Sequence, residues 1–97
     1  MTHAIWTTAA VADLDDIKTY LTETCSANFA QHMLNALILS ARWLAANPRA
    51  GAPLDVSGWR KWKPRKTRYV LIYEPVEDGI SIYRVRHERN DWHPVPE

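Results

Sequence analysis

The sequence has a single cysteine, Cys25, and no long hydrophobic run. One cysteine cannot form an intramolecular disulfide, and a lone cysteine in a helical pattern is more often a small packing residue than a nucleophile, so we assign Cys25 no role. The chain does not start with a basic region followed by an apolar one, and no run approaches the roughly 18 to 20 apolar residues of a membrane span. We therefore expect a soluble, cytoplasmic protein without a membrane partner.

Net charge is also small, because twelve Lys and Arg are balanced by eleven Asp and Glu. The two halves differ, however: residues 1–58 carry three basic and five acidic side chains, whereas residues 59–97 carry nine and six. The basic excess is concentrated in GWRKWKPRKTRYVLIY, residues 58–73, which has six cationic side chains, two tryptophans and no acid. Such a segment creates a local field that attracts a polyanion or an acidic protein.

Two helices are predicted in the first half of the chain, after a short strand over residues 3–7. They span residues 8–24 and 26–48, where apolar residues recur at helical spacing. Asp13, Asp15 and Asp16 fall in the early turns of the first helix, where the helix dipole favours negative charge. A chain of 97 residues, 46% of them hydrophobic, is long enough for one core and too short for two, so we expect a single domain over residues 1–97.

Three strands are predicted in the second half. Residues 49–58 contain glycine and proline without periodicity and are interpreted as a connection. After them, Val, Ile, Tyr and Trp are frequent in three stretches, which span residues 59–63, 67–75 and 79–86. The period of two and the turn at Glu77, Asp78 and Gly79 predict a three-stranded antiparallel meander. The expected architecture is therefore α+β, with one sheet and a layer of two helices.

Four segments of the sequence carry a family resemblance. They are AVADLDDIKTYL in the first helix, LAANPRAG at the end of the second, RKW followed by RYVLIY, and DGISIYRVRHERNDW. In this order, and over almost the whole chain, they resemble the RelE/ParE superfamily of bacterial type II toxin-antitoxin toxins, nearest to the ParE, or plasmid stabilisation, branch. The resemblance implies a RelE/ParE-like fold and a toxin that a cognate antitoxin protein neutralises. It also implies binding of operator DNA only through the antitoxin complex, and no cofactor.

The resemblance leaves three activities open. ParE toxins inhibit DNA gyrase, RelE toxins cleave mRNA on the ribosome, and a non-toxic member would retain antitoxin binding alone. An RNA-cleaving toxin must activate a 2′-hydroxyl and stabilise a phosphate, so it needs acids, bases and Arg or Lys around one phosphate. Ribonuclease toxins commonly carry an arginine where this chain has Val70, and Arg68, two residues earlier on the same face, is a partial substitute at best. We therefore predict gyrase inhibition without a catalytic residue; a ribonuclease would use His87, Arg68 and Arg86.

The basic segment of the sequence and the end of the last predicted strand supply the candidate target-binding residues. These are Lys61, Lys63, Arg65, Lys66, Arg68, Arg84, Arg86, His87, Arg89 and Trp92. Alternation in an edge strand should direct Arg60 and Trp62 to one face and Trp59, Lys61 and Lys63 to the other. These residue types suit both nucleic acid and an acidic protein such as the antitoxin, or gyrase.

The end of the chain also admits a structural interpretation. Asp91 would then pair with an arginine, and Trp92 would cover the edge of the core. His87, Asp91 and His93 lie close in sequence, but a proline-containing tail without paired cysteines makes a poor zinc site, so no metal is expected.

Overall fold

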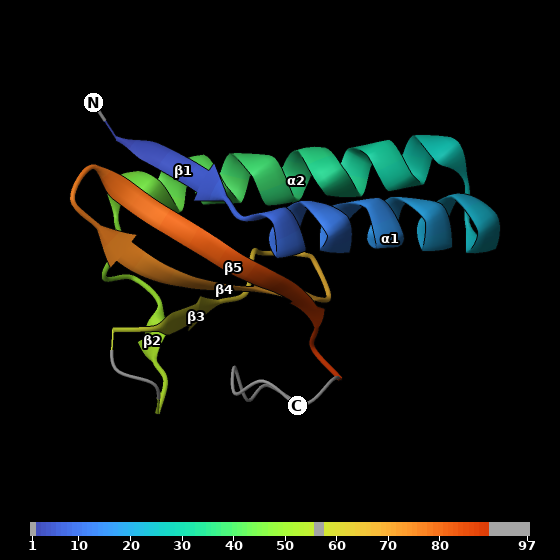
Figure 1. Ribbon diagram of the computed structural model, residues 1–97. Coiled ribbons are helices and arrows are strands. Elements are labelled where there is room, and N and C mark those ends of the chain that lie inside the picture. The colour runs from blue at the N-terminus through green and yellow to red at the C-terminus, as the bar shows by residue number, and fades with distance from the viewer. Residues whose placement is uncertain (1, 56–57, 90–97) are drawn as a thin grey trace.

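The computed structural model describes residues 2–55 and 58–89, and its element order is that of the predicted α+β fold (Figure 1). The elements are β1 (His3–Trp6), α1 (Thr8–Thr24), α2 (Ala27–Ala46), β2 (Ala52–Pro53), β3 (Arg60–Trp62), β4 (Tyr69–Val76) and β5 (Gly79–His87). Every predicted element is present, with ends within two residues of the prediction.

The sheet has five strands in the order β1-β5-β4-β3-β2, one more strand than the sequence predicted. β3, β4 and β5 form the expected antiparallel meander, and β1 adds to its edge in parallel with β5. The additional strand, β2, lies in the segment interpreted as a connection and pairs antiparallel with β3. It is only two residues long and ends in Pro53, which is tolerated at an outer edge because no neighbour requires its missing N–H there. No periodic pattern could have indicated so short a strand.

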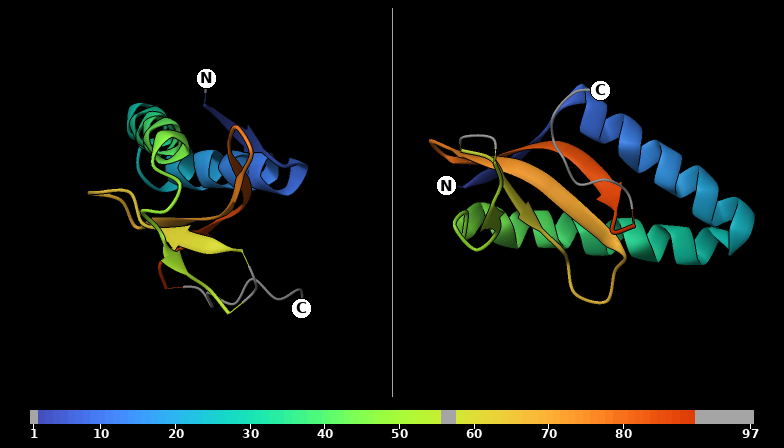
Figure 2. Two further views of the ribbon diagram at one scale, coloured as in Figure 1. Left: turned by 90° about the vertical axis from the view of Figure 1, so that its left-hand side faces the viewer. Right: turned by 90° about the horizontal axis from the view of Figure 1, so that it is seen from below.

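The α1–α2 hairpin packs along one face of the sheet, as the two views of Figure 2 show. Each helix begins at a hydroxyl cap, since Thr7 Oγ1 accepts a hydrogen bond from Ala10 N at 3.1 Å and Ser26 Oγ accepts one from Phe29 N at 3.0 Å. These caps satisfy backbone donors that would otherwise lack a partner. Neither helix of the described chain is long and apolar enough to cross a membrane.

The core lies between the hairpin and the sheet. Its buried side chains from the helices are Ala10, Ile17, Leu21, Ala30, Met33, Leu37, Ala41, Leu44 and Ala45, and those from the sheet are Tyr69, Leu71, Tyr73, Ile80, Ile82 and Val85. The face that helical spacing predicts for α1, formed by Ala10, Leu14, Ile17 and Leu21, is confirmed. The spacing also places Phe29 and Ile38 on the apolar face of α2, but both are exposed, so that predicted face was too wide.

Asp13 contacts the sheet, which corrects the interpretation of the α1 acids as dipole partners, because no acid lies in the first turn of this helix. β1 pairs only with the first half of β5, from Gly79 to Ile82. Beyond that point, the Asp13 carboxylate accepts hydrogen bonds from Val85 N at 2.9 Å and from Arg84 Nε and Nη2 at 2.8 and 2.9 Å. Asp13 therefore supplies the acceptor that a longer β1 would have offered to this edge of β5.

Candidate functional site

The predicted basic stretch forms β3 and a tight turn before β4; we call residues 60–68 the basic segment. Pro64 and Thr67 are buried inside the turn, and Thr67 Oγ1 donates to the Pro64 carbonyl at 2.9 Å. Lys66 adopts a left-handed backbone conformation, with φ of 63°. Arg65 and Lys66 are exposed and make no ion pair within residues 2–55 and 58–89. The fold thus holds the turn by its uncharged residues and leaves two cations at its tip.

The alternation predicted for β3 agrees with the ring contacts. Trp62 packs against the core and stacks on Trp43 of α2, with ring centroids 5.2 Å apart. Trp59 instead stacks on Tyr83, with centroids 4.5 Å apart. Arg60 is engaged within the protein, because its Nη1 donates to the Gly51 carbonyl at 2.6 Å and to the Arg49 carbonyl at 3.3 Å. Arg60 therefore holds the loop before β2.

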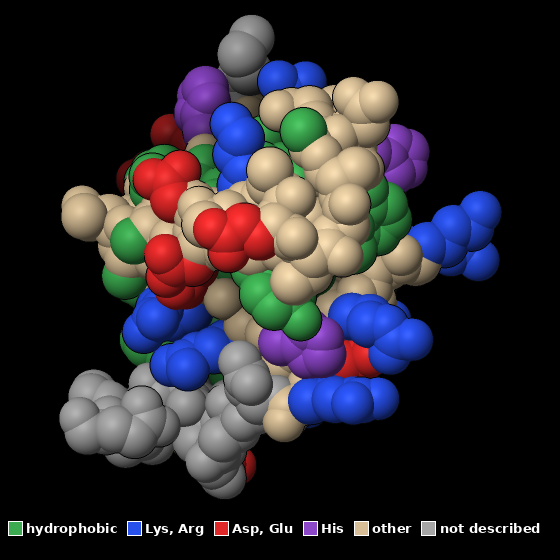
Figure 3. Space-filling view, turned by 90° about the vertical axis from the view of Figure 1, so that its right-hand side faces the viewer, with side chains coloured by type: hydrophobic (Ala, Val, Ile, Leu, Met, Phe, Trp, Pro, Cys, Tyr) green, Lys and Arg blue, Asp and Glu red, His purple; other side chains and the backbone are tan. Residues whose placement is uncertain are grey.

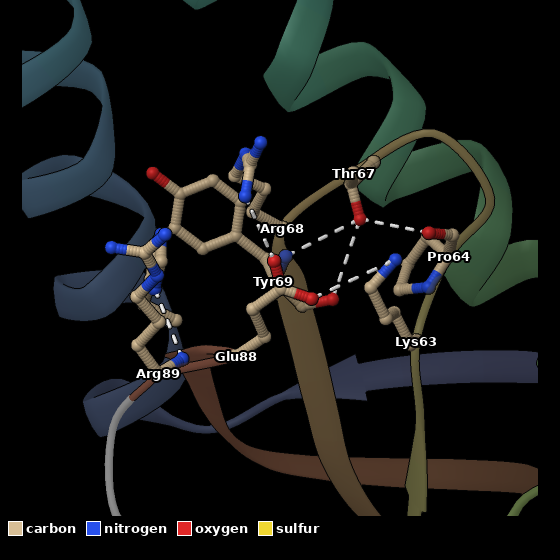
Figure 4. Close-up of polar contacts among 8 residues, drawn as sticks. Lys63, Pro64, Thr67, Arg68, Tyr69, Glu88 and Arg89 are labelled. Atoms are coloured by element: carbon tan, nitrogen blue, oxygen red, sulfur yellow. Dashed lines mark hydrogen bonds and ion pairs between the residues drawn. The ribbon is translucent and has the colours of Figure 1, made fainter.

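Glu88 neutralises part of the basic segment (Figure 4). Its carboxylate lies 3.2 Å from Arg68 Nη1 and 3.9 Å from Lys63 Nζ. Its backbone N–H donates to the Arg68 carbonyl at 2.7 Å, which fixes the acid beside the start of β4. The Arg68 side chain is 68% exposed, so this pair is weakly shielded from solvent.

Val70 stands where a phosphate-binding arginine would be expected in a ribonuclease. It is 4% exposed and pairs in register with Arg86 on β5. With Lys61, Lys63 and Glu88, it lines a groove of about 560 Å³. Arg68, the possible substitute, is held by Glu88. Arg86 Nε is buried and has no hydrogen-bond partner among the described residues.

His87 lines a cleft of about 470 Å³ between α1 and the end of β5, which we call the histidine cleft, and Arg68 is not part of its lining. The cleft is lined by Asp13, Asp16, Ile17, Tyr20, Tyr69, Arg84, Val85, Arg86 and His87. His87 contacts the edge of the Tyr69 ring, and its Nδ1 accepts a hydrogen bond from Arg89 N at 3.1 Å. Burial raises the pKa of Tyr69, with smaller contributions from Tyr20 and Cys25, so its hydroxyl stays protonated at neutral pH.

The electrostatics of the histidine cleft do not favour a phosphate. Two carboxylates, those of Asp13 and Asp16, line it with His87, and Arg84 is already paired with Asp13. Figure 3 shows most acidic side chains of this face gathered on its left side, with Lys and Arg side chains both above and below them. A phosphodiester in the cleft would meet like charge beside its only histidine. The cleft can therefore hold a proton donor or acceptor, and Arg86 is the one cation of its lining that forms no ion pair among the described residues.

The structure brings the candidate residues together as two groups. The first group lies in the basic segment and comprises Lys61, Lys63, Arg65, Lys66 and Arg68, of which Lys61 and Lys63 also line the Val70 groove. The second group lines the histidine cleft and comprises Arg84, Arg86 and His87. Arg89 is exposed beside His87. The candidate Trp92, and the suggested roles of Asp91 and His93, lie outside the described residues. Within the part of the chain that is described, no three His, Cys, Asp or Glu side chains group as metal ligands.

The comparisons with known proteins agree with this architecture. Residues 4–92 match the family model of the ParE toxin of the type II toxin-antitoxin system parDE. The chain belongs to the ParE toxin family. A solved structure of the chromosomal ParDE TA system from P. aeruginosa contains a chain similar to it, with a TM-score of 0.79 and 25% sequence identity. That similarity covers 90% of this ParE-family chain and 96% of the other. No curated protein sequence gave a match.

Sequence reasoning missed three contacts of this ParE-family chain. They are the Asp13–Arg84 pair, the position of Glu88 between two cations, and the stacking of Trp43 on Trp62. Only Glu88 gave a partial signal in the sequence. It is the one acid among residues 84–88, which include the end of the last predicted strand. All three contacts join residues that are far apart in the sequence.

Proposed function

We propose that this ParE-family toxin inhibits bacterial DNA gyrase by binding, without making or breaking a bond itself. The observation that carries the proposal concerns position 70, where ribonuclease toxins commonly carry a phosphate-binding arginine. This chain has a buried valine there, Val70, and the nearby Arg68 is paired with Glu88. Transition-state stabilisation of RNA cleavage requires donors aimed at the phosphate oxygens. A toxin that acts by binding requires only an accessible surface.

The distribution of charge supports the basic segment as that surface. Lys63, Arg65, Lys66 and Arg68 share one neighbouring acid, Glu88, among the described residues. An exposed cation contributes little to folding, usually within about 0.5 kcal/mol. The same cations attract a polyanionic or acidic partner over long range and increase its association rate. Binding, rather than stability, therefore explains why so many cations are presented together.

The cognate antitoxin is the second proposed partner. A partly disordered antitoxin chain would fold on binding, with apolar anchors along the helical hairpin and acidic side chains toward the basic segment. The exposed Leu39 and Trp43 on α2 are suitable apolar contacts for such a chain. Contact with operator DNA is assigned to the antitoxin part of the complex, as the family resemblance implies. We expect complex formation to raise the melting temperature and to weaken as salt is added.

The two toxin activities can be separated by inducing the chain without its antitoxin. Gyrase inhibition predicts that DNA synthesis stops and that purified gyrase accumulates cleaved DNA, while mRNA stays intact for the first minutes. Codon-specific mRNA cleavage that His87→Ala abolishes would instead establish the ribonuclease. A chain that binds antitoxin but leaves both processes unchanged would be a non-toxic family member.

A further inference from the structure

A groove of about 600 Å³ lies beside α2 and shares two cations, Lys63 and Arg65, with the basic segment. Ser40, Trp43, Trp62, Lys63 and Arg65 line it, and we call it the tryptophan groove. Its aromatic surface is the Trp43–Trp62 pair, whose rings stack at 5.2 Å with an interplanar angle of 29°. Trp43 is nevertheless 48% exposed, so much of its indole remains accessible. A half-exposed tryptophan held in place by a second one forms a pre-ordered stacking platform.

The cations of the groove are also held in place. Lys63 and Arg65 flank Pro64, which is buried, and the turn is closed by the hydrogen bonds of Thr67 N and Oγ1 to the Pro64 carbonyl. Lys63 lies at the outer limit of an ion pair with Glu88, at 3.9 Å, and Arg65 makes none within the described ranges. No acid among the described residues lines the groove. A negatively charged group can therefore reach Arg65 without meeting like charge, whereas at Lys63 it shares the cation with Glu88.

We propose that the tryptophan groove binds single-stranded nucleic acid, with a base stacked on Trp43 and the two adjoining phosphates at Lys63 and Arg65. Indole faces beside cations are the usual means of binding single strands, because every base has a face to stack and every nucleotide a phosphate. The Ser40 hydroxyl can hydrogen-bond to a base edge or a phosphate oxygen.

An acidic amphipathic helix is the competing occupant, and the composition of the lining argues against it. Such a helix inserts aliphatic anchors into a groove with an apolar floor and walls. Among the described residues, the tryptophan groove contains no aliphatic side chain, and the exposed Leu39, one turn before Trp43, is not part of its lining. Aromatic rings, cations and a hydroxyl match a nucleotide better than they match leucine side chains.

The test measures binding of fluorescein-labelled oligothymidylate and oligouridylate of about 12 nucleotides, a length typical of single-strand sites, by fluorescence anisotropy. We expect both to bind and to quench tryptophan fluorescence. Trp43→Leu should weaken binding about ten-fold, and Trp43→Phe should restore much of it because stacking is retained. The combined change Lys63→Gln and Arg65→Gln should reduce the slope of log affinity against log salt by about 1.4, two single-strand phosphate contacts.

The controls change the same two types of residue, an aromatic side chain and a cation, elsewhere on the surface. Phe29→Leu alters another exposed aromatic residue of α2, and Arg42→Gln removes a cation that lies away from the groove; both should leave oligonucleotide binding unchanged. Folding of each variant is checked by circular dichroism.

The proposal is overturned if Trp43→Leu, though folded, binds as well as the parent chain. It is also overturned if Arg42→Gln weakens binding as much as the groove variants, or if an acidic helical peptide occupies the groove and the oligonucleotides do not. Trp43→Leu keeps Lys63 and Arg65, so this variant measured in both the oligonucleotide and the gyrase assays lets each proposal fail alone.

Discussion

The contact between α1 and β5 and the basic segment both carry arginine and lysine, but they differ in how those charges are satisfied. At the first, Arg84 and the half-buried Asp13 form a two-point ion pair that also binds the backbone of β5. At the second, Arg65 and Lys66 have no ionic partner among the described residues, and Lys63 shares Glu88 with Arg68. The difference indicates which charges stabilise the fold and which are available to another molecule.

The largest expected effect comes from removing the unsatisfied charges. Lys63→Gln, Arg65→Gln and Lys66→Gln together should lower the potency of gyrase inhibition by about ten-fold or more, because electrostatic steering changes association rates by 10- to 1,000-fold. The free energy of unfolding should change by less than about 1 kcal/mol. Potency is measured as the toxin concentration that halves supercoiling, and stability by urea unfolding.

A matched control removes three cations that lie elsewhere: Lys18→Gln, Arg42→Gln and Arg49→Gln. This variant has the same net charge as the basic-segment variant, so equal loss of potency in both would mean that total charge matters and position does not. A folded basic-segment variant with full potency would move the target-binding surface to the histidine cleft.

The satisfied charges should behave in the opposite way. Asp13→Asn is expected to lower the free energy of unfolding by about 2 to 3 kcal/mol, because it weakens the pairing of Arg84 and the charge-assisted bond from Val85 N. The figure is below that of a fully buried pair, since Arg84 is partly solvated. Asp15→Asn, an exposed acid on the same helix, is the control and should be nearly neutral. Equal stability of the two variants in urea unfolding would show that Asp13 contributes no more than a surface acid.

How much could be predicted from the sequence depends on whether a feature is local or joins residues that are far apart in the chain. The helices and the three strands of the meander are local patterns, visible for the helices in the spacing of residues such as Ile17 and Leu21 and in the cap at Ser26. The exposed basic turn was also predictable, because Pro64 interrupts a strand between cations. By contrast, Asp13 meets Arg84 only after the chain has returned to the sheet, and periodicity holds no information on such a pairing.

A smaller effect is expected where the loop before β2 is attached to the sheet, beside the structural cation Arg60. The Tyr73 hydroxyl donates to the Pro48 carbonyl at 2.7 Å and accepts from Gly51 N at 2.9 Å. Tyr73→Phe removes both bonds and should lower the free energy of unfolding by about 1 to 2 kcal/mol near neutral pH. Tyr20→Phe, at an exposed tyrosine, should have little effect.

The Tyr73 prediction includes a pH dependence. Burial raises the pKa of Tyr73, although the hydrogen bond from Gly51 and the charge of Arg60 partly oppose the shift. A phenol with a raised pKa in the folded state contributes stability that is fully present below its unfolded pKa, near 10, and is lost as the pH rises through the folded pKa. The stability gap between the parent and Tyr73→Phe should therefore narrow above about pH 10. A gap that is constant from pH 8 to about pH 11 would contradict this.

The smallest effect is expected at Glu88, the one described acid that forms ion pairs with cations of the basic segment. Glu88→Gln leaves Lys63 and Arg68 without their shared partner, yet exposed ion pairs contribute so little that unfolding should change by less than about 0.5 kcal/mol. The freed cations should strengthen gyrase inhibition by about two- to three-fold in dilute salt, and the gain should disappear near 1 M salt, where the screening length falls to about 3 Å. Glu77→Gln, in the turn before β5, removes an equal charge far from the basic segment and should show no gain. A loss of potency in Glu88→Gln would instead mean that this carboxylate touches the target, and that the basic segment binds through its acid as well as its cations.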